Sequence, residues 1–225
     1  MTKPQTEAVP ETDVLLIGAG IMSSTLAVML KELDPKLTIK LYETLESEAL
    51  ESSNAWDNAG TGHAALCEMN YTPEKPDGSV DISAALEVNT EFDLSRQFWT
   101  YLTEKGKIKD PQQFIHPVPH HSFVTGEKNV TFLKKRFETL TAHHCYKGMV
   151  YTEDKEQIKK WAPLIMKDRD PKEQVAMTRM TTGTDVNYGA LTNILLGSLK
   201  KDDGFDVHFS SKVTDLEREG DKWKV

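Results

Sequence analysis

The feature of this chain that most limits its fold is a glycine turn between a buried strand and a helix. Residues 13–23 read Asp-Val-Leu-Leu-Ile-Gly-Ala-Gly-Ile-Met-Ser, so an apolar run leads into Gly18 and Gly20. Gly18 permits a tight turn, and Gly20 lets the backbone approach a pyrophosphate. The next helix N-terminus offers N–H groups and the positive end of its dipole. The pattern predicts a nucleotide-binding βαβ unit, with contacts from Gly18, Ala19, Gly20, Ile21, Met22 and Ser23.

The rest of this unit follows in register. The helix carries six apolar residues that we expect on its buried face, Asp34-Pro35 ends it, and residues 38–42 form a second strand. Glu43 lies where the dinucleotide fingerprint has the acid that binds the adenosine ribose. Ser23 replaces the third glycine, and the alternative is a buried glycine turn without a ligand. The six apolar residues are Ile21, Met22, Leu26, Met29, Leu30 and Leu33.

A long segment of small and amide side chains follows, at residues 46–73. A nicotinamide-binding domain would instead continue with short alternating helices and strands. Gly60 and Gly62 remove side-chain bulk where a flat ring can lie against the backbone. The segment therefore fits a flavin, and donors and acceptors for the flavin edge come from Ser52, Ser53, Asn54, Asn58 and Thr61.

Composition excludes several classes of function. The net charge is -8, with 35 acidic and 27 basic residues and no basic run, which argues against a nucleic-acid partner. Two cysteines give no disulfide framework and fit a reducing compartment. Residues 1–12 are predicted to be a flexible arm rather than a signal peptide, which favours a protein that stays inside the cell. No apolar run is long enough to span a bilayer, so any membrane contact would be peripheral.

Along the remaining chain, periodicity predicts helices at residues 83–105, 129–140 and 154–161, and one strand over 114–125. Residues 175–180 are predicted to be extended, and a helix follows near Leu191, with either Asp185 or Asn187 as its cap. Period-two alternation and the Glu219-Gly-Asp turn predict a hairpin at the end. Because this hairpin stops at Val225, we expect the chain to be a fragment of a longer protein.

These motifs resemble the flavin-dependent malate:quinone oxidoreductases. The resemblance covers nearly the whole chain from Asp13 and is carried by the glycine turn, Glu-Ser-Ser-Asn-Ala-Trp-Asp-Asn-Ala-Gly-Thr-Gly-His, His-Pro-Val-Pro-His, Phe-Leu-Lys-Lys-Arg, Trp-Ala-Pro-Leu and Gly-Thr-Asp-Val-Asn-Tyr-Gly-Ala-Leu-Thr. The second and last motifs are specific to this family, whereas the first is common among flavoproteins. One departure is Asp57, where the family is expected to have asparagine.

The resemblance implies an α/β fold: a glutathione-reductase-like FAD-binding βαβ domain with an inserted, incomplete α+β substrate domain. The expected boundaries are 13–75 and 181–225 for the FAD-binding domain and 76–180 for the substrate segment. It also implies FAD-dependent oxidation of L-malate to oxaloacetate in the tricarboxylic acid cycle, with electrons passing to a membrane quinone. The implied location is cytoplasmic, in peripheral contact with the inner face of the membrane.

Oxidation of a secondary alcohol needs a proton acceptor and donors for the substrate carboxylates. His63 follows the Gly-Thr-Gly stretch that the resemblance places beside the flavin, although it could equally be a histidine bonded to backbone. His116 and His120 are substrate-pocket candidates, with loop packing as the alternative. Arg179 can bind a carboxylate bidentately or form a structural ion pair. Asp185, Asn187 and Tyr188 are candidates to shape the same region.

Two further interpretations stay open: an FAD-dependent oxidase of a related hydroxy or amino acid that uses oxygen, and a non-catalytic nucleotide-binding remnant. No metal site is predicted. His63 and Cys67 are four residues apart and residues 143–145 read His-His-Cys, but neither set has a recognised zinc spacing. Adjacent residues are also not expected to converge on one helix face.

Overall fold

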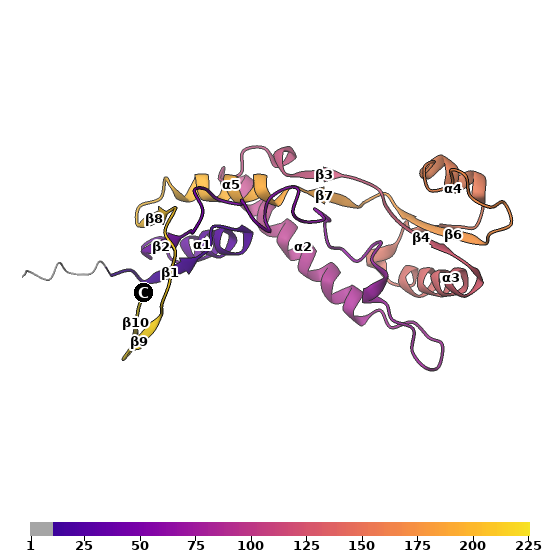
Figure 1. The fold of residues 1–225 in the computed structure, drawn as a ribbon, viewed down its shortest axis with the longest axis horizontal. Coiled ribbons are helices and arrows are strands. Elements are labelled where there is room, and N and C mark those ends of the chain that lie inside the picture. The colour runs from indigo at the N-terminus through magenta and orange to yellow at the C-terminus, as the bar shows by residue number, and fades with distance from the viewer. Residues whose placement is uncertain (1–10) are drawn as a thin grey trace, which may run out of the picture. The chain divides into compact units, whose positions relative to one another are not determined.

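The structure, a computed structural model, describes residues 11–225. These residues form two compact units, each assembled from separate stretches of chain (Figure 1). Unit 1 comprises the chain up to Gly60, Leu102–Phe114 and Asn187–Val225, and unit 2 comprises Thr61–Tyr101 and Ile115–Val186. The arm predicted at 1–12 lies, up to residue 10, outside the described residues.

Unit 1 contains the predicted βαβ crossover. Strand β1 (Val14–Ile17), helix α1 (Ile21–Leu33) and strand β2 (Ile39–Tyr42) follow one another, and the two strands pair in parallel. Strand β8 (Phe205–His208) extends the parallel sheet beside β2. Helix α5 (Tyr188–Leu199) lies beside α1 (Figure 1). The strand–turn–helix–strand order read from the sequence is therefore confirmed.

The buried face of α1 differs from the prediction. Met22 and Leu33 are 81% and 83% exposed, and Leu26 and Met29 are also exposed. Helix α5 packs against α1, and the buried residues of α1 are Ser24, Ala27, Val28 and Lys31, of which three have short side chains. Small residues let two helices approach closely, which the apolar pattern alone does not reveal.

Lys31 is buried because its ammonium group is satisfied by backbone. Its Nζ donates hydrogen bonds to the carbonyl oxygens of Pro35 (2.7 Å), Leu37 (3.0 Å) and Asp203 (2.6 Å). An ammonium has three donors, and each finds an acceptor here. The residue thereby ties the end of α1 to the segments that precede β2 and β8.

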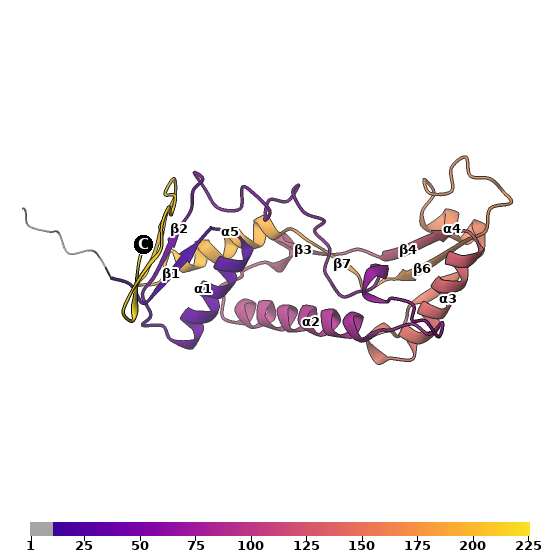
Figure 2. The same ribbon diagram turned by 60° about the horizontal axis from the view of Figure 1, so that its bottom comes forward.

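Unit 2 is built on an antiparallel sheet with helices on both faces (Figure 2). The strand order is β4 (His120–Thr125), β6 (Val175–Met180) and β5 (Val150–Thr152). Helix α3 (Glu127–Thr141) covers one face, where Val130 and Leu133 pack on Val124 and Ala176. Helix α4 (Lys155–Trp161) covers the other, where Ile158 packs on Val175 and Met177. The predicted helices and the strand at 175–180 are confirmed.

The stretch predicted as one strand, 114–125, is two. Strand β3 (Ile115–Pro117) pairs with β7 (Thr184–Val186), whereas β4 pairs with β6. Residues 118 and 119 separate β3 from β4, and Pro119 has no N–H to donate to a ladder.

Helix α2 (Ser83–Glu104) matches the predicted helix 83–105, and its last turn belongs to unit 1. Within this helix Leu94 is 59% exposed, whereas Asn89 is buried. The terminal hairpin is confirmed as β9 (Glu217–Glu219) and β10 (Lys222–Lys224), with Gly220 at φ +63° in the turn. Each of its two strands is three residues long.

Candidate functional site

The glycine turn of unit 1 is fastened to the end of β2. Gly18, at φ +90°, donates its N–H to the Tyr42 carbonyl oxygen at 2.8 Å. The next N–H, of Ala19, donates to Glu43 Oε2 at 2.6 Å, and Glu43 Oε1 accepts from the Leu45 N–H at 2.8 Å. The predicted acid is thus held beside the predicted phosphate-binding turn.

The N-terminus of α1 has no cap from its own sequence. Gly20 occupies the N-cap position without a side-chain hydrogen bond, and the first turn contains no acid. The Ile21 N–H instead donates to Ser53 Oγ at 2.9 Å. A Cβ on Gly20 would lie 3.0 Å from this oxygen, so glycine allows the loop that carries Ser53 to approach. The structure therefore brings Gly18, Gly20, Glu43 and Ser53 together.

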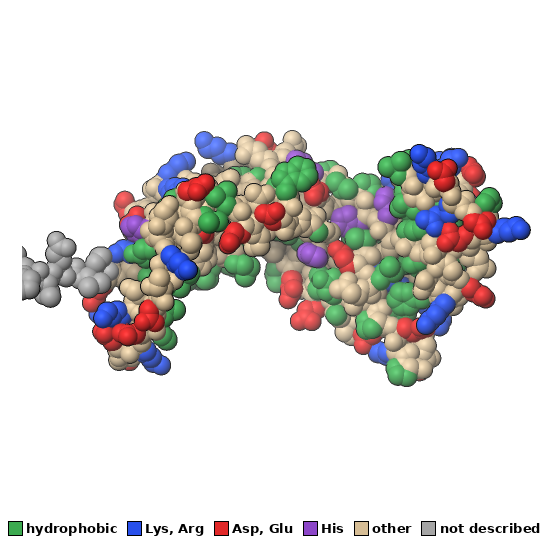
Figure 3. Space-filling model, in the orientation of Figure 1, with side chains coloured by type: hydrophobic (Ala, Val, Ile, Leu, Met, Phe, Trp, Pro, Cys, Tyr) green, Lys and Arg blue, Asp and Glu red, His purple; other side chains and the backbone are tan. Residues whose placement is uncertain are grey.

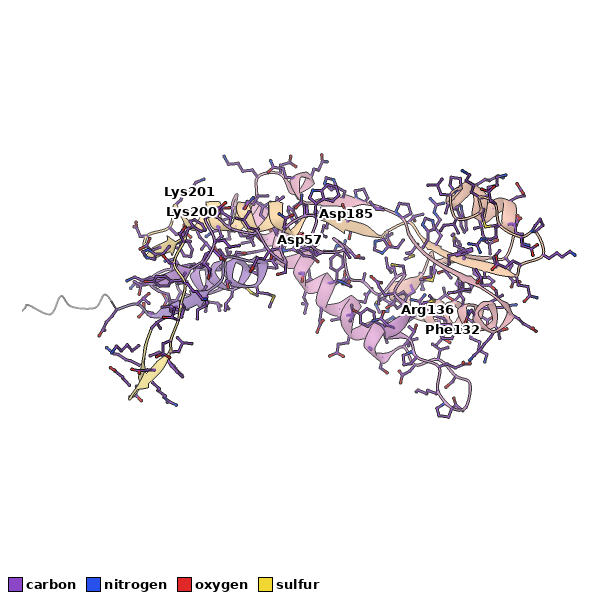
Figure 4. All side chains as sticks on the ribbon, in the orientation of Figure 1. Asp57, Phe132, Arg136, Asp185, Lys200 and Lys201 are labelled. Atoms are coloured by element: carbon purple, nitrogen blue, oxygen red, sulfur yellow. The ribbon has the colours of Figure 1, made fainter. Side chains whose placement is uncertain are left out.

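The amide side chains of the following loop hold the loop itself. Asn58 Nδ2 donates to the carbonyl oxygens of Ser52 (3.0 Å) and Asn54 (2.7 Å), and Asn58 Oδ1 accepts from the Gly60 N–H at 2.9 Å. Asn54 Oδ1 accepts from the Trp56 N–H at 3.0 Å. Asp57, the departure from the family pattern, is exposed in this loop (Figure 4).

In unit 2, three of the sequence motifs meet at β3 and β7. Thr61 forms an antiparallel bridge with Asp185, and Asp185 lies in register opposite His116. The Gly62 N–H donates to the Thr184 carbonyl oxygen at 2.9 Å. A Cβ on Gly62 would overlap Thr184 Oγ1 and lie 2.7 Å from Phe92 Cζ. Packing within the chain is thus one physical reason for glycine at this position.

His63 is half-exposed and has a carboxylate neighbour that the sequence did not indicate. Its Nδ1 lies 3.6 Å from Glu68 Oε1, and its ring meets the edge of Tyr71 with centroids 6.5 Å apart. Glu68 Oε2 accepts from the Cys67 N–H at 3.3 Å, which fixes the carboxylate. A carboxylate beside an imidazole orients the ring and selects its tautomer.

His120 is buried among groups that pack against it. Its Nε2 lies 3.1 Å from the Thr184 carbonyl oxygen and its Nδ1 3.7 Å from Cys67 Sγ. Burial, followed by the Glu68 carboxylate, raises the pKa of the Cys67 thiol to about 12. These contacts match the packing alternative for His120. His116 is exposed on β3, and histidine side chains are visible on the surface in Figure 3.

Arg179 lies on the α4 face of the sheet beside a histidine that our sequence reading did not select. His121 is opposite Arg179 in the β4–β6 register. The Arg179 guanidinium lies over the Trp161 ring, 5.4 Å from its centroid, and the His121 ring lies 6.3 Å from the same ring. Alternation along β4 provides the missed signal, because it places His121 on the face opposite His120.

Both side chains carry a buried nitrogen that lacks a partner. Among the described residues, neither Arg179 Nε nor His121 Nε2 has a hydrogen bond. Burial, followed by the charges of Arg179 and His120, lowers the pKa of His121, so its ring is neutral near pH 7. A buried donor without a partner is costly, and an anion beside Arg179 Nε would satisfy it, as it would His121 Nε2 in the tautomer that carries the proton on this nitrogen.

The structure decides between the two proposed caps of α5. Asn187 occupies the N-cap position, and its Oδ1 accepts from the Ala190 N–H at 2.9 Å. Asp185 lies within β7. Burial raises the pKa of Tyr188, which keeps its phenol protonated. Within residues 11–225, no helix combines the length and the apolar character that crossing a bilayer demands.

Comparison with known proteins gives one consistent family. The sequence profile of the malate:quinone oxidoreductase family matches residues 10–225. A probable malate:quinone oxidoreductase from Bradyrhizobium diazoefficiens is 62% identical over 96% of this chain and 42% of that protein. A probable malate:quinone oxidoreductase from Granulibacter bethesdensis is 58% identical over 95% of this chain and 43% of that protein. The chain thus spans about two fifths of the length of these relatives.

Solved structures share the fold at low sequence identity. Glycine oxidase from Geobacillus kaustophilus superposes with a TM-score of 0.64 at 14% identity, over 92% of this chain and 48% of that chain. L-alpha-glycerophosphate oxidase from Mycoplasma pneumoniae, solved with FAD bound, superposes with a TM-score of 0.61 at 15% identity, over 95% of this chain and 48% of that chain. The chain therefore shares a mixed α/β fold with these two solved oxidases.

Proposed function

The chain belongs to the malate:quinone oxidoreductase family, and we propose that it takes part in the oxidation of L-malate to oxaloacetate with FAD as cofactor and a quinone as electron acceptor. The observation that carries this proposal is the family match over residues 10–225. The curated relatives are more than twice as long as the region they share with this chain, so the activity is proposed for a protein of family length. Reduction of a lipid-soluble quinone would bring the protein to a membrane surface.

The turn in unit 1 fits the cofactor. The α1 N-terminus has no acid in its first turn and Gly20 contributes no side-chain cap, so the positive end of the helix dipole suits a pyrophosphate. Gly18, Gly20 and Ser53 would line the phosphates, and Glu43 would accept hydrogen bonds from the ribose. Bound FAD would supply a hydride acceptor for the alcohol carbon of malate.

We assign the flavin-edge contacts to the remaining predicted residues of the loop, namely Ser52, Asn54, Asn58, Gly60, Thr61 and Gly62. We also propose the finer fold assignment, a glutathione-reductase-like FAD-binding domain at 13–75 and 181–225 with an inserted, incomplete α+β substrate segment at 76–180. The two compact units divide the chain at other positions, after Gly60 and before Asn187. Low-identity fold similarity supports the general architecture. The family resemblance supports the boundaries.

The His63–Glu68 pair is our candidate for removing the hydroxyl proton of malate. A base must be neutral and oriented, and the Glu68 carboxylate 3.6 Å from Nδ1 supplies the orientation. The His63 side chain is half-exposed, and Nε2 is the ring nitrogen that would accept the proton. His116, exposed opposite Asp185, is the second candidate because it lies in register beside the same loop.

The substrate carboxylates require positive or hydrogen-bond donors. Among the described residues, Arg179 and His121 supply two buried nitrogens without partners on one sheet face, and the guanidinium lies over the Trp161 ring. A guanidinium binds a carboxylate through paired N–H groups, which gives geometry as well as charge. We propose that these two residues bind one carboxylate of malate.

An anaerobic titration of the family-length protein tests the function. L-malate should bleach the yellow absorption of bound flavin, and a quinone analogue should restore it faster than oxygen does. Glycine is the matched alternative substrate. Bleaching by glycine but not by malate would favour an oxidase, and a purified protein that retains no flavin and shows no malate oxidation would favour a remnant.

A further inference from the structure

A histidine pair and a cysteine converge at the end of α3, away from the residues assigned above. His143, His144 and Cys145 lead into a short 3-10 turn, η3 (His144–Tyr146). Their ligand atoms all lie within 4.8 Å of one another, and within the described residues this is the only group of three or more His, Cys, Asp or Glu side chains so arranged. Adjacent residues would point apart on an α-helix, but the tight turn gathers them here.

The spacing of one pair already suits a tetrahedral ion. Cys145 Sγ lies 3.5 Å from His144 Nε2. Zinc–sulfur bonds of about 2.3 Å and zinc–nitrogen bonds of about 2.0–2.1 Å, at a tetrahedral angle, separate the two ligands by ~3.6 Å. Two nitrogen ligands of a tetrahedral ion lie ~3.4 Å apart, so any pair near the 4.8 Å limit must close by roughly 1 Å when the ion binds.

His143 can make that shift at little cost. Its Nδ1 accepts a long hydrogen bond, 3.4 Å, from the Cys145 N–H. The ring centroids of His143 and His144 lie 4.3 Å apart, and the two ring planes are tilted by 37°. A long neutral hydrogen bond is weak, and coordination of the ring by an ion would more than replace it.

The turn that carries the three side chains is anchored. Tyr146 is fully buried, and its hydroxyl donates to the Ala85 carbonyl oxygen of α2 at 2.9 Å. A cleft of about 380 Å³ lies between α2 and the turn, lined by Asp93, Gln97 and the three candidate ligands among others. Asp93, which lines the same cleft, adds negative charge beside the candidate ligands. Room for an ion and for water is therefore present.

We propose that His143, His144 and Cys145 bind one divalent transition-metal ion of the zinc class, with water in the fourth position. Imidazole and thiolate donors select zinc-like ions over magnesium or calcium, which prefer oxygen. Binding releases the thiol proton to solvent and leaves the metal oxidation state unchanged. The ion would brace the turn against α2. This site requires neither FAD nor malate and is independent of the proposed function.

The test uses the 225-residue chain, purified without a polyhistidine tag and stripped of metal by a chelator. Cobalt(II) is the probe, because a thiolate ligand gives it a charge-transfer band in the near ultraviolet, and zinc(II) is then added to displace it. The variant is Cys145→Ser, a nearly isosteric change at a half-buried position. The matched control is His208→Asn, which removes a histidine of unit 1 that lies 3.0 Å from Asp206.

The wild-type chain and His208→Asn should bind one cobalt ion with the thiolate band, and stoichiometric zinc should abolish that band. Cys145→Ser should lose the band, and its affinity for zinc should fall by over ~100-fold. Loss of a group that only supports a ligand costs roughly 10–100-fold in metal affinity, so a larger loss indicates that the thiolate is itself a ligand. An unchanged urea midpoint for Cys145→Ser without metal shows that folding is intact. A wild-type chain without the band, or equal zinc affinity in Cys145→Ser, would overturn the proposal.

Discussion

The imidazole of His120 lies directly against the backbone of Gly183, so a Cβ added at residue 183 would overlap ring atoms Cγ and Cδ2. The same Cβ would lie 2.5 Å from the Val118 carbonyl oxygen, which is closer than Cβ contacts in proteins come. Two motifs separated by some sixty residues are therefore fitted to one another at this contact. Glycine at 183 is required by packing.

Gly183→Ala should therefore destabilise unit 2. The added methyl group overlaps a ring and a carbonyl oxygen that are held by other contacts, and overpacking of this kind costs about 1–3 kcal/mol. Gly197→Ala is the matched control, because nothing lies within 4 Å of a Cβ there. Gly197 is inside α5, so alanine should stabilise by about 0.5–1 kcal/mol. Urea unfolding midpoints measure both, and equal shifts would contradict the assigned contact.

Arg136 and Lys135, neighbours on α3, should differ sharply when replaced by methionine. Arg136 is fully buried (Figure 4) and donates to Thr72 Oγ1 at 2.9 Å and to the carbonyl oxygens of Ala65 (3.3 Å) and Glu68 (3.2 Å). Arg136→Met leaves these acceptors without donors and should cost about 2–4 kcal/mol. Lys135 is 43% exposed and pairs with Glu74, so Lys135→Met should cost under about 1 kcal/mol.

Hydrogen exchange distinguishes the loss of the Arg136 hydrogen bonds from a general loss of side-chain packing in Arg136→Met. If Arg136 holds the segment that contains Ala65, Glu68 and Thr72, amide protection across residues 65–72 should fall in Arg136→Met more than protection in β6. Uniform loss of protection across unit 2 would show that the residue stabilises the unit without holding this segment.

Cys67 should be unusually slow to alkylate. Burial, then the Glu68 carboxylate, raises its pKa from 9.0 to about 12, which lowers the thiolate fraction near pH 8 by roughly 10³-fold, one factor of ten per pKa unit. The raised pKa also stabilises the folded state below pH 9, and this contribution is lost as pH rises toward 12. Iodoacetamide labelling followed by mass spectrometry compares folded chain with urea-unfolded chain. Equal rates at Cys67 would contradict its burial.

The exposed and buried sides of α1 give a test of packing. Val28 is fully buried, so Val28→Ala should cost about 1–3 kcal/mol. Met22 is 81% exposed, so Met22→Ala should change stability of the chain by less than about 0.5 kcal/mol. Chemical denaturation of both variants decides the matter. A larger loss of stability in Met22→Ala than in Val28→Ala would instead support the buried face that the apolar pattern of the sequence predicted.

The apolar pattern of α1 illustrates which parts of the fold could be predicted from the sequence. Local signals placed β1, α1, β2 and the strand 175–180 correctly, because strand and helix periods and glycine turns are encoded within a few residues. The buried face of α1 is decided by its neighbour α5, which lies more than 150 residues further along the chain. Such long-range partners leave no trace in a single hydrophobic pattern.

The candidate site was predicted unevenly for the same reason. Glu43 follows a strand at a known distance from a glycine turn, so its place was predictable. Glu68 and His121 were missed because their importance depends on His63 and Arg179 lying beside them in space. The convergence of residues 143–145 was missed because a 3-10 turn, rather than an α-helix, follows α3.

The proposed carboxylate donors can be tested in the family-length protein by separating KM from kcat. Arg179→Lys keeps the positive charge but loses the paired N–H geometry, and His121→Asn keeps a donor while removing the ring. If both bind one carboxylate of malate, each should raise KM by roughly 10–100-fold, about 1.4–2.8 kcal/mol of binding, with a smaller effect on kcat.

Arg169→Lys is the matched control for Arg179→Lys. The Arg169 guanidinium also lies over an aromatic ring, 4.9 Å from the Phe123 centroid, but its Nη1 already donates to Glu173 Oε2 at 2.6 Å. Because the Arg169 guanidinium already pairs with a carboxylate, we do not expect it to bind substrate, and the KM of Arg169→Lys should stay within about twofold of wild type. A similar rise in KM for both arginine variants would mean that lysine disturbs the sheet generally, and Arg179 would lose its assignment as a substrate-binding residue.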